Sequence, residues 1–184
     1  MFSIESLERR IQQLESRHAI AELVSSYAIA CDSHDIEKLA NIFTVDGTIE
    51  SPSKLLEAAG RDGIRATFLK RYKIRGPSYH WTHDHKVVFD PDDPDLASGL
   101  VLGHAETFPN EEACIAALRY EDDYRRVDGQ WLFARRVVKF LYYVPVTEYH
   151  KVLGTKLRLL VGGARHPADY PETLRTWQDL LSHP

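Results

Sequence analysis

The stretch of sequence that decides the fold runs from Ala113 to Val144 and reads ACIAALRYEDDYRRVDGQWLFARRVVKFLYYV. It is rich in β-branched and aromatic residues, and the four residues VDGQ at 127–130 interrupt it near its middle. An Asp-Gly pair between two such runs is a strong signal for a tight β-hairpin. The stretch therefore predicts two long antiparallel strands, residues 113–126 and residues 130–144.

Two earlier segments, residues 79–90 and residues 96–108, have the same strand-like character, and proline-containing turns separate them. Helices first and four long strands afterwards indicate an α+β protein. We expect its N-terminal helices to pack on one face of a strongly curved, mixed or antiparallel sheet. Such a sheet forms a cone-shaped barrel, and the open end of the cone is a natural pocket for a small molecule.

The first third of the chain carries apolar residues at steps of three and four, which is typical of helices. The stripe changes phase near Arg17, so it predicts either two helical segments or one long helix, ending near Asp32. A short helix capped by Asp35 and a third helix opening at Gly60 follow, and Asp46-Gly47 predicts a turn between them. After residue 145 the pattern weakens, with a strand or lid segment at 152–160 and a terminal helix at 173–181.

Composition excludes several classes of protein. The length of 184 residues suits one domain, and the net charge of −4 without a Lys/Arg run argues against nucleic-acid binding. No apolar run approaches the ~18–20 residues of a membrane span, and the N-terminal segment is charged, so we expect neither a membrane partner nor a signal peptide. Two cysteines are too few for a disulfide framework, which favours a cytoplasmic location.

Three of the nine histidines lie within YHWTHDH, residues 79–85. Strand alternation divides this segment into two faces, with His80, Thr82 and Asp84 on one and Trp81, His83 and His85 on the other. A metal site would use His83 and His85 as two ligands, but the sequence offers no clear third ligand. We therefore interpret both as surface or interface histidines and predict no metal.

His80 is the candidate general base, provided that a carboxylate orients its second ring nitrogen. The candidate carboxylate is Asp32, at the end of the first helical region. On one continuous helix Tyr27 and Asp32 point about 140° apart, so both face one pocket only if the helix ends before Asp32. The alternative interpretation of Asp32 is a carboxylate that caps the end of the helix.

The last strand contains an arginine in an apolar row. Strict alternation places Arg136 on one face with Phe140 and Tyr142, and places Phe133 on the other face. An arginine in such a row is rare unless it is paired with a carboxylate or a ligand. Arg136 is therefore either half of a structural ion pair or a contact for the substrate.

Five segments carry a family resemblance: residues 19–32, 35–43 (DIEKLANIF), 60–64 (GRDGI), 120–124 (YEDDY) and 128–136 (DGQWLFARR). As a series they resemble the SnoaL-like group of the nuclear-transport-factor-2-like superfamily. The resemblance implies a cone-shaped α+β barrel domain over residues 1–145, commonly a dimer or trimer. It leaves residues 146–184 as a C-terminal extension, for which a lid and an oligomer contact are the two candidate roles.

Within the superfamily the sequence is most similar to the scytalone dehydratase, bile-acid 7α-dehydratase and lindane dehydrochlorinase families. Those enzymes eliminate water or HCl with an Asp-His dyad and without a metal or organic cofactor. The resemblance maps the dyad onto Asp32 and His80, a pocket tyrosine onto Tyr27 and a pocket arginine onto Arg136. The sequence departs from many relatives at Asp84, where they carry asparagine.

The resemblance implies a cofactor-independent lyase that acts, as a homotrimer or homodimer, on a small hydrophobic, cyclic or steroid- or polyketide-like substrate. Further candidate contacts with the substrate are Trp81, Asp84, His104, Tyr120, Phe140 and Tyr142. Two alternatives stay open. One is an isomerase of the ketosteroid type, which shares the first proton abstraction. The other is a non-catalytic scaffold such as the small subunit of a ring-hydroxylating dioxygenase.

Overall fold

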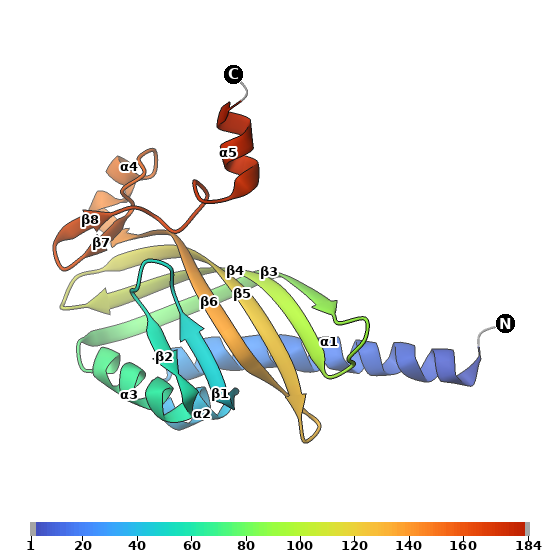
Figure 1. Ribbon diagram of the computed structural model, residues 1–184. Coiled ribbons are helices and arrows are strands. Elements are labelled where there is room, and N and C mark those ends of the chain that lie inside the picture. The colour runs from blue at the N-terminus through green and yellow to red at the C-terminus, as the bar shows by residue number, and fades with distance from the viewer. Residues whose placement is uncertain (1–2, 183–184) are drawn as a thin grey trace.

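The computed structural model describes residues 3–182, and Figure 1 shows the arrangement of its elements. The helices are α1 (Ile4–Asp32), α2 (Ile36–Asn41), α3 (Gly60–Tyr72), α4 (Tyr149–Val152) and α5 (Arg175–Ser182), with a 3-10 turn at Val146–Glu148. The strands are β1 (Phe43–Glu50), β2 (Glu57–Ala59), β3 (Arg75–Phe89), β4 (Leu96–Pro109), β5 (Cys114–Val127), β6 (Gln130–Pro145), β7 (Leu159–Val161) and β8 (Ala164–His166). The four strands predicted between residues 79 and 144 are thus confirmed as β3–β6.

The strands of the described chain form one sheet in the order β2-β1-β6-β5-β4-β3, with β7 and β8 attached beside β6. Strands β1 and β7 run parallel to β6, whereas the other neighbours are antiparallel, so the sheet is mixed. In Figure 1 the sheet curves around the N-terminal helices, and α1 packs against β3 and β6 while α3 packs against β1. The predicted α+β cone with helices on one face of a strongly curved sheet is confirmed.

The hairpin between β5 and β6 forms where the Asp-Gly pair predicts it. Asp128 and Gly129 both have positive φ angles, 51° and 78°. A two-residue hairpin turn of type I′ needs positive φ at both central positions, and Asp and Gly tolerate that conformation best. The turn therefore sets the register of the two strands that form the centre of the sheet.

The first helix is continuous in spite of the phase change in its apolar stripe. Its N-terminal half extends past the sheet in Figure 1, and Ile4, Ile11 and Leu14 are exposed there. From Ile20 onwards one apolar face of the helix is buried in the main core, and Tyr27 belongs to that buried stripe, whereas Ile29 on the other face is exposed. The change of phase marks the point at which the helix meets the sheet, so the choice between two segments and one helix resolves to one helix.

Gly47 has a different role from the predicted turn. It lies inside β1, where the pairing of β1 with β6 shifts register between Phe43 and Thr48. A Cβ atom at Gly47 would stand 2.9 Å from the carbonyl oxygen of Phe133. Glycine is therefore required here by the close approach of two strands, and the predicted Asp46-Gly47 turn is wrong.

The segment after residue 145 packs onto the end of the barrel. Strand β7 pairs in parallel with β6 at Tyr143 and Leu159, and the Asp169 carboxylate accepts a hydrogen bond from the backbone N–H of Phe140 at 2.9 Å. The buried Arg158 donates to the carbonyl oxygen of Leu141 at 2.7 Å. The extension thus completes one end of the sheet. None of the described helices is both long and apolar enough to cross a membrane.

Candidate active site

Asp32 and His80 are in direct contact. The Nδ1 atom of His80 lies 2.6 Å from Oδ1 of Asp32, and the backbone N–H of His80 donates to Oδ2 at 2.9 Å. The Ser78 hydroxyl donates to Oδ1 at 3.3 Å. An ionised carboxylate only accepts, so Nδ1 carries the ring proton and Nε2 of the neutral imidazole keeps its lone pair. The two carboxylate oxygens therefore fix both the orientation and the tautomer of His80.

The contact between Asp32 and His80 forms in a geometry different from the one predicted from the sequence. Helix α1 includes Asp32, and the chain turns only afterwards, at Ser33 and at His34 with its φ of 53°. Asp32 and Tyr27 therefore do point in different directions. Asp32 faces β3, and the imidazole of His80 extends from that carboxylate to the cavity, so the condition that the helix end before Asp32 is unnecessary.

His80 and Tyr27 line the same inner cavity, which measures about 40 Å³. The apolar part of its wall consists of Leu56, Phe68, Ala105, Ala116, Leu118, Val138 and Phe140. The polar part consists of Tyr27, Cys31, Arg71, Arg75, His80, Thr107, Tyr120 and Tyr143. The structure thus brings together four of the sequence-predicted side chains, Tyr27, His80, Tyr120 and Phe140, around one small cavity.

Tyr27 is held rigidly in the wall of this cavity. Its ring makes edge contacts with the rings of Phe43, Tyr120 and Phe133, at centroid distances of 5.9–6.4 Å. Burial raises the pKa of Tyr27 well above its ordinary value, and the nearby Arg136 opposes this only in part. Burial likewise raises the pKa of Tyr120. Both phenols therefore stay protonated at neutral pH and can donate a hydrogen bond.

Arg136 is in an ion pair and does not line the cavity. Its Nε and Nη2 atoms donate to the two oxygens of Asp122 at 2.8 and 2.7 Å, and neither side chain is exposed to solvent. Its guanidinium carbon lies 4.0–4.2 Å from the ring centroids of Tyr27, Tyr120 and Phe133. Burial disfavours its charge, but the Asp122 carboxylate outweighs that effect and raises the pKa of Arg136. Of the two alternatives for Arg136, the structural ion pair is the one observed.

Two bulges in β6 explain why strict alternation misplaced its side chains. The pairing of β6 with β5 shifts register once near Phe133 and again between Phe140 and Tyr142. A bulge adds one residue and reverses which face the following side chains occupy. Arg136 consequently shares the inner face with Phe133. Tyr142 leaves the face of Phe140 and packs against Tyr149, with ring centroids 5.1 Å apart, so its predicted position at the pocket is wrong.

A bulge in β3 likewise changes which face of the strand the side chains of the histidine-rich segment occupy, so the two faces predicted for it are partly wrong. Asp84 has a φ of 51°, and the pairing with β4 shifts register between His83 and Lys86. His85 turns inwards, and its Nε2 lies 3.2 Å from the Tyr124 hydroxyl. His83 and His85 thus lie on opposite faces. Within residues 3–182 no group of three His, Cys, Asp or Glu side chains is placed to hold a metal ion.

Three of the predicted substrate contacts lie on the outer face of the sheet. Asp84 contacts Nδ1 of His83 at 2.8 Å, and Nε2 of His83 lies 3.3 Å from Nδ1 of His104. Trp81 pairs with His104 across β3 and β4, and its ring makes a tilted contact with the ring of the exposed Tyr79. The predictions that Trp81, Asp84 and His104 face the pocket are therefore wrong. Alternation places Trp81 and its cross-strand neighbour His104 on the face opposite His80, and the bulge at Asp84 turns that residue outwards.

Sequence reasoning missed the two arginines in the cavity wall. Arg71 lies in the last turn of α3 and Arg75 begins β3. Basic residues are common at helix C-termini because they complement the helix dipole, so this pair looked like ordinary helix-end charge. The signal that could have found it is the position of Arg75 as the first residue of the strand that carries His80, with Arg71 four residues earlier.

Comparison with known proteins places this architecture among described relatives. Residues 12–137 match the SnoaL-like domain. The gamma-hexachlorocyclohexane dehydrochlorinase of Sphingobium indicum is 25% identical over 148 residues, which covers 76% of this chain and 90% of that protein.

Solved structures agree with this match. A hexachlorocyclohexane dehydrochlorinase (LinA) of type 2 superposes with a TM-score of 0.69 at 21% identity, over 74% of this chain and 93% of the other. A scytalone dehydratase-like protein of Novosphingobium aromaticivorans superposes with a TM-score of 0.67 at 23% identity, over 74% and 91% of the two chains. At these identities the solved structures establish a shared fold.

Proposed function

The chain belongs to the SnoaL-like domain family, and on that premise we propose that it is a cofactor-independent lyase that eliminates water, or a comparable leaving group, from a small hydrophobic substrate. The observation that carries the proposal is the 2.6 Å contact between Asp32 and His80 beside a cavity that Tyr27 also lines. A relative named as a dehydrochlorinase, at 25% identity, supports the same class of reaction.

For a substrate with a carbonyl group, the first step is removal of a proton from the carbon next to that group. Nε2 of His80 takes the proton, and the electron pair of the C–H bond moves onto the carbonyl to form an enolate. Asp32 stabilises the resulting imidazolium through Nδ1. The Tyr27 hydroxyl donates a hydrogen bond to the enolate oxygen, which is effective because Tyr27 is buried and the His80 side chain is only 9% exposed.

The second step expels the leaving group and restores the enzyme. The enolate re-forms the carbonyl, a carbon–carbon double bond forms, and the bond to the leaving hydroxyl breaks. His80 returns its proton to that hydroxyl, so water leaves and the imidazole is neutral again. Arg136 takes part only indirectly, because its stacked guanidinium holds the rings of Tyr27 and Tyr120 in place.

Product analysis in D₂O tests the proposal. Cyclic β-hydroxy ketones and γ-hexachlorocyclohexane are incubated with the protein and followed by NMR for deuterium uptake and alkene formation. We expect elimination of water or HCl from at least one of them, and we expect His80→Ala to lower its rate by ~100-fold or more.

The other outcomes distinguish the alternatives. Migration of a double bond without loss of a leaving group would support the isomerase. A partner protein that co-purifies at equal stoichiometry, with no proton exchange at any substrate, would support the scaffold. Equal rates for the wild type and His80→Ala would contradict the role of the dyad.

A further inference from the structure

The inner cavity shares three lining residues, Arg71, Arg75 and Tyr143, with a second cavity at the same end of the barrel. This outer cavity measures about 450 Å³, and residues 160–163 of the β7–β8 hairpin form part of its wall. Ligand-binding cavities usually measure about 300–1,000 Å³, so the outer cavity has room for the body of a substrate. The inner cavity, at about 40 Å³, has room only for its reacting end. Arg71 and Arg75 therefore stand at the neck between the two.

Neither arginine at the neck has an acidic partner among residues 3–182. Arg71 donates one hydrogen bond, from Nη1 to the carbonyl oxygen of Leu55 at 2.7 Å. The side chain of Arg75 makes no hydrogen bond or ion pair with another described residue, although Arg75 is half-buried. The carboxylate of Glu112 lies on the rim of the outer cavity, but it is exposed and pairs with neither of them.

The other deeply placed arginines are neutralised. Arg136 is paired with Asp122, and Arg158 with Glu172 at 2.7 Å. The two buried arginines of the described chain thus each have a carboxylate partner, whereas the half-buried Arg61 donates to the backbone carbonyl oxygens of Phe43 and Asn41. Half-buried charge without a partner is unfavourable, so its presence at the neck calls for an anion that comes from outside the chain.

The electrostatics of the neck agree with this reading. Burial and then the charge of Arg75 lower the pKa of Arg71. Burial raises the pKa of Cys31 to about 11, and the charge of Arg75 opposes that rise. The same charge opposes the rise in the pKa of Tyr120. The positive potential of the neck therefore reaches into the inner cavity beside His80.

We propose that Arg71 and Arg75 together bind a carboxylate group of the substrate. This inference rests on the proposed function and narrows its substrate class to hydrophobic cyclic acids whose reacting C–H lies a few atoms from the carboxylate. The planar guanidinium presents a fork of N–H donors that matches the two oxygens of a carboxylate. With the carboxylate at the neck, the apolar body lies in the outer cavity and the reacting carbon lies at Nε2 of His80.

Binding of a matched pair of probes tests this without knowledge of the natural substrate. Calorimetry compares 2-naphthoate with its neutral isostere 2-naphthamide, and inorganic phosphate serves as a third probe. We expect the wild type to bind 2-naphthoate at least about tenfold more tightly than 2-naphthamide, because hydrogen bonds to charged groups are strong. Arg75→Gln reduces that preference, and the Arg71→Gln/Arg75→Gln double variant removes it.

The controls separate this inference from the proposed function. Lys70→Gln and Lys73→Gln each remove a positive charge from exposed positions beside the neck, and both should keep the preference. His80→Gln should keep the preference while turnover is lost. Arg75→Lys, with folding checked by thermal unfolding, retains part of the preference if charge is what matters.

Three results would overturn the assignment. The first is equal affinity of the wild type for 2-naphthoate and 2-naphthamide, or no binding of either probe. The second is a preference for 2-naphthoate that persists in the double variant. The third is tighter binding of phosphate than of 2-naphthoate. If His80→Gln loses turnover and none of these three results is obtained, the experiments support both the proposed function and the carboxylate site. Unchanged turnover in His80→Gln with an intact preference would refute the dyad alone.

Discussion

Two contacts between a histidine and an aspartate lie on opposite faces of the same strand, three residues apart. On the inner face, Nδ1 of His80 lies 2.6 Å from Asp32, and on the outer face Nδ1 of His83 lies 2.8 Å from Asp84. The side chain of His80 is 9% exposed, whereas that of His83 is 42% exposed. The distances are nearly equal, and the surroundings differ.

What differs is how each aspartate is held and what the second ring nitrogen meets. Asp32 comes from another element, 48 residues away, and is fixed by a backbone N–H and a hydroxyl as well. Asp84 is the chain neighbour of His83 and lies in solvent, where water screens the interaction. His80 meets a cavity, whereas His83 meets another exposed imidazole, that of His104. Burial and long-range support therefore distinguish a candidate dyad from a surface pair.

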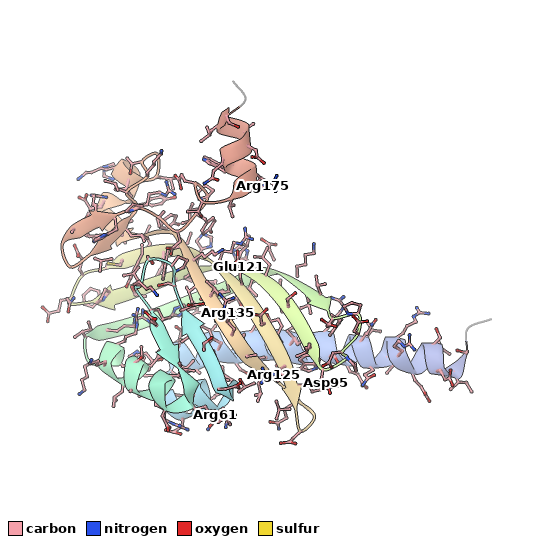
Figure 2. The ribbon with its side chains drawn as sticks, viewed as in Figure 1. Arg61, Asp95, Glu121, Arg125, Arg135 and Arg175 are labelled. Atoms are coloured by element: carbon pink, nitrogen blue, oxygen red, sulfur yellow. The ribbon has the colours of Figure 1, made fainter. Side chains whose placement is uncertain are left out.

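The largest effect that we expect is on stability, and it comes from comparing Asp122 on the inner face with its neighbour Asp123 on the outer face. Asp122→Ala leaves Arg136 buried without its carboxylate and removes the acceptor of the Tyr124 hydroxyl at 2.9 Å. We expect a loss of about 3–5 kcal/mol in the free energy of unfolding, measured by urea denaturation. Asp123→Ala, whose carboxylate is 3.8 Å from the exposed Arg135 (Figure 2), should cost at most about 1 kcal/mol. Similar losses in the two variants would contradict the contrast between the faces.

This inner ion pair shows how far the sequence could predict the site. The apolar row around Arg136 correctly predicted that it needs a partner, and the turn at 128–129 correctly predicted the hairpin. The partner and the face of Tyr142 depended on bulges in β6, which add one residue without a sequence signal strong enough to place them. Periodicity predicts the elements, whereas register shifts decide which side chains meet.

The same holds for the histidine-rich segment. The pairing of His80 with Asp32 was reachable from the residue types and the resemblance, because both groups lie at the ends of predicted elements. The inward orientation of His85 could not be predicted from the sequence, because it depends on the positive φ of Asp84. Arg71 and Arg75 were missed because the role proposed for them depends on the lack of an acidic partner among residues 3–182, which spacing along the chain does not show.

The next largest effect that we expect is on turnover, and it comes from comparing Asp32 with Asp84. Asp32→Asn removes the charge that stabilises the imidazolium and the acceptor that fixes the tautomer, so we expect kcat to fall by ~100-fold or more. Asp84→Asn makes the same change on the outer face and should leave kcat within about twofold. Steady-state kinetics on the substrate identified by product analysis measures both. A comparable fall in the two variants would mean that the outer pair belongs to the site.

The smallest effect is a pH dependence of stability that also separates the faces. Burial lowers the pKa of the inward-turned His85, and the charges of Arg136 and Arg17 lower it further, while Asp122 opposes them. The pKa in the folded state is below the ordinary value of about 6.5, so the unfolded chain binds more protons as the pH falls through that value. The free energy of unfolding therefore decreases as the pH falls from about 6.5 towards the folded-state pKa. Urea denaturation at about pH 8 and about pH 5.5 should show a smaller decrease in His85→Gln than in the wild type. If His85→Gln showed an equal or larger decrease, burial of His85 on the inner face would not be a source of the pH dependence.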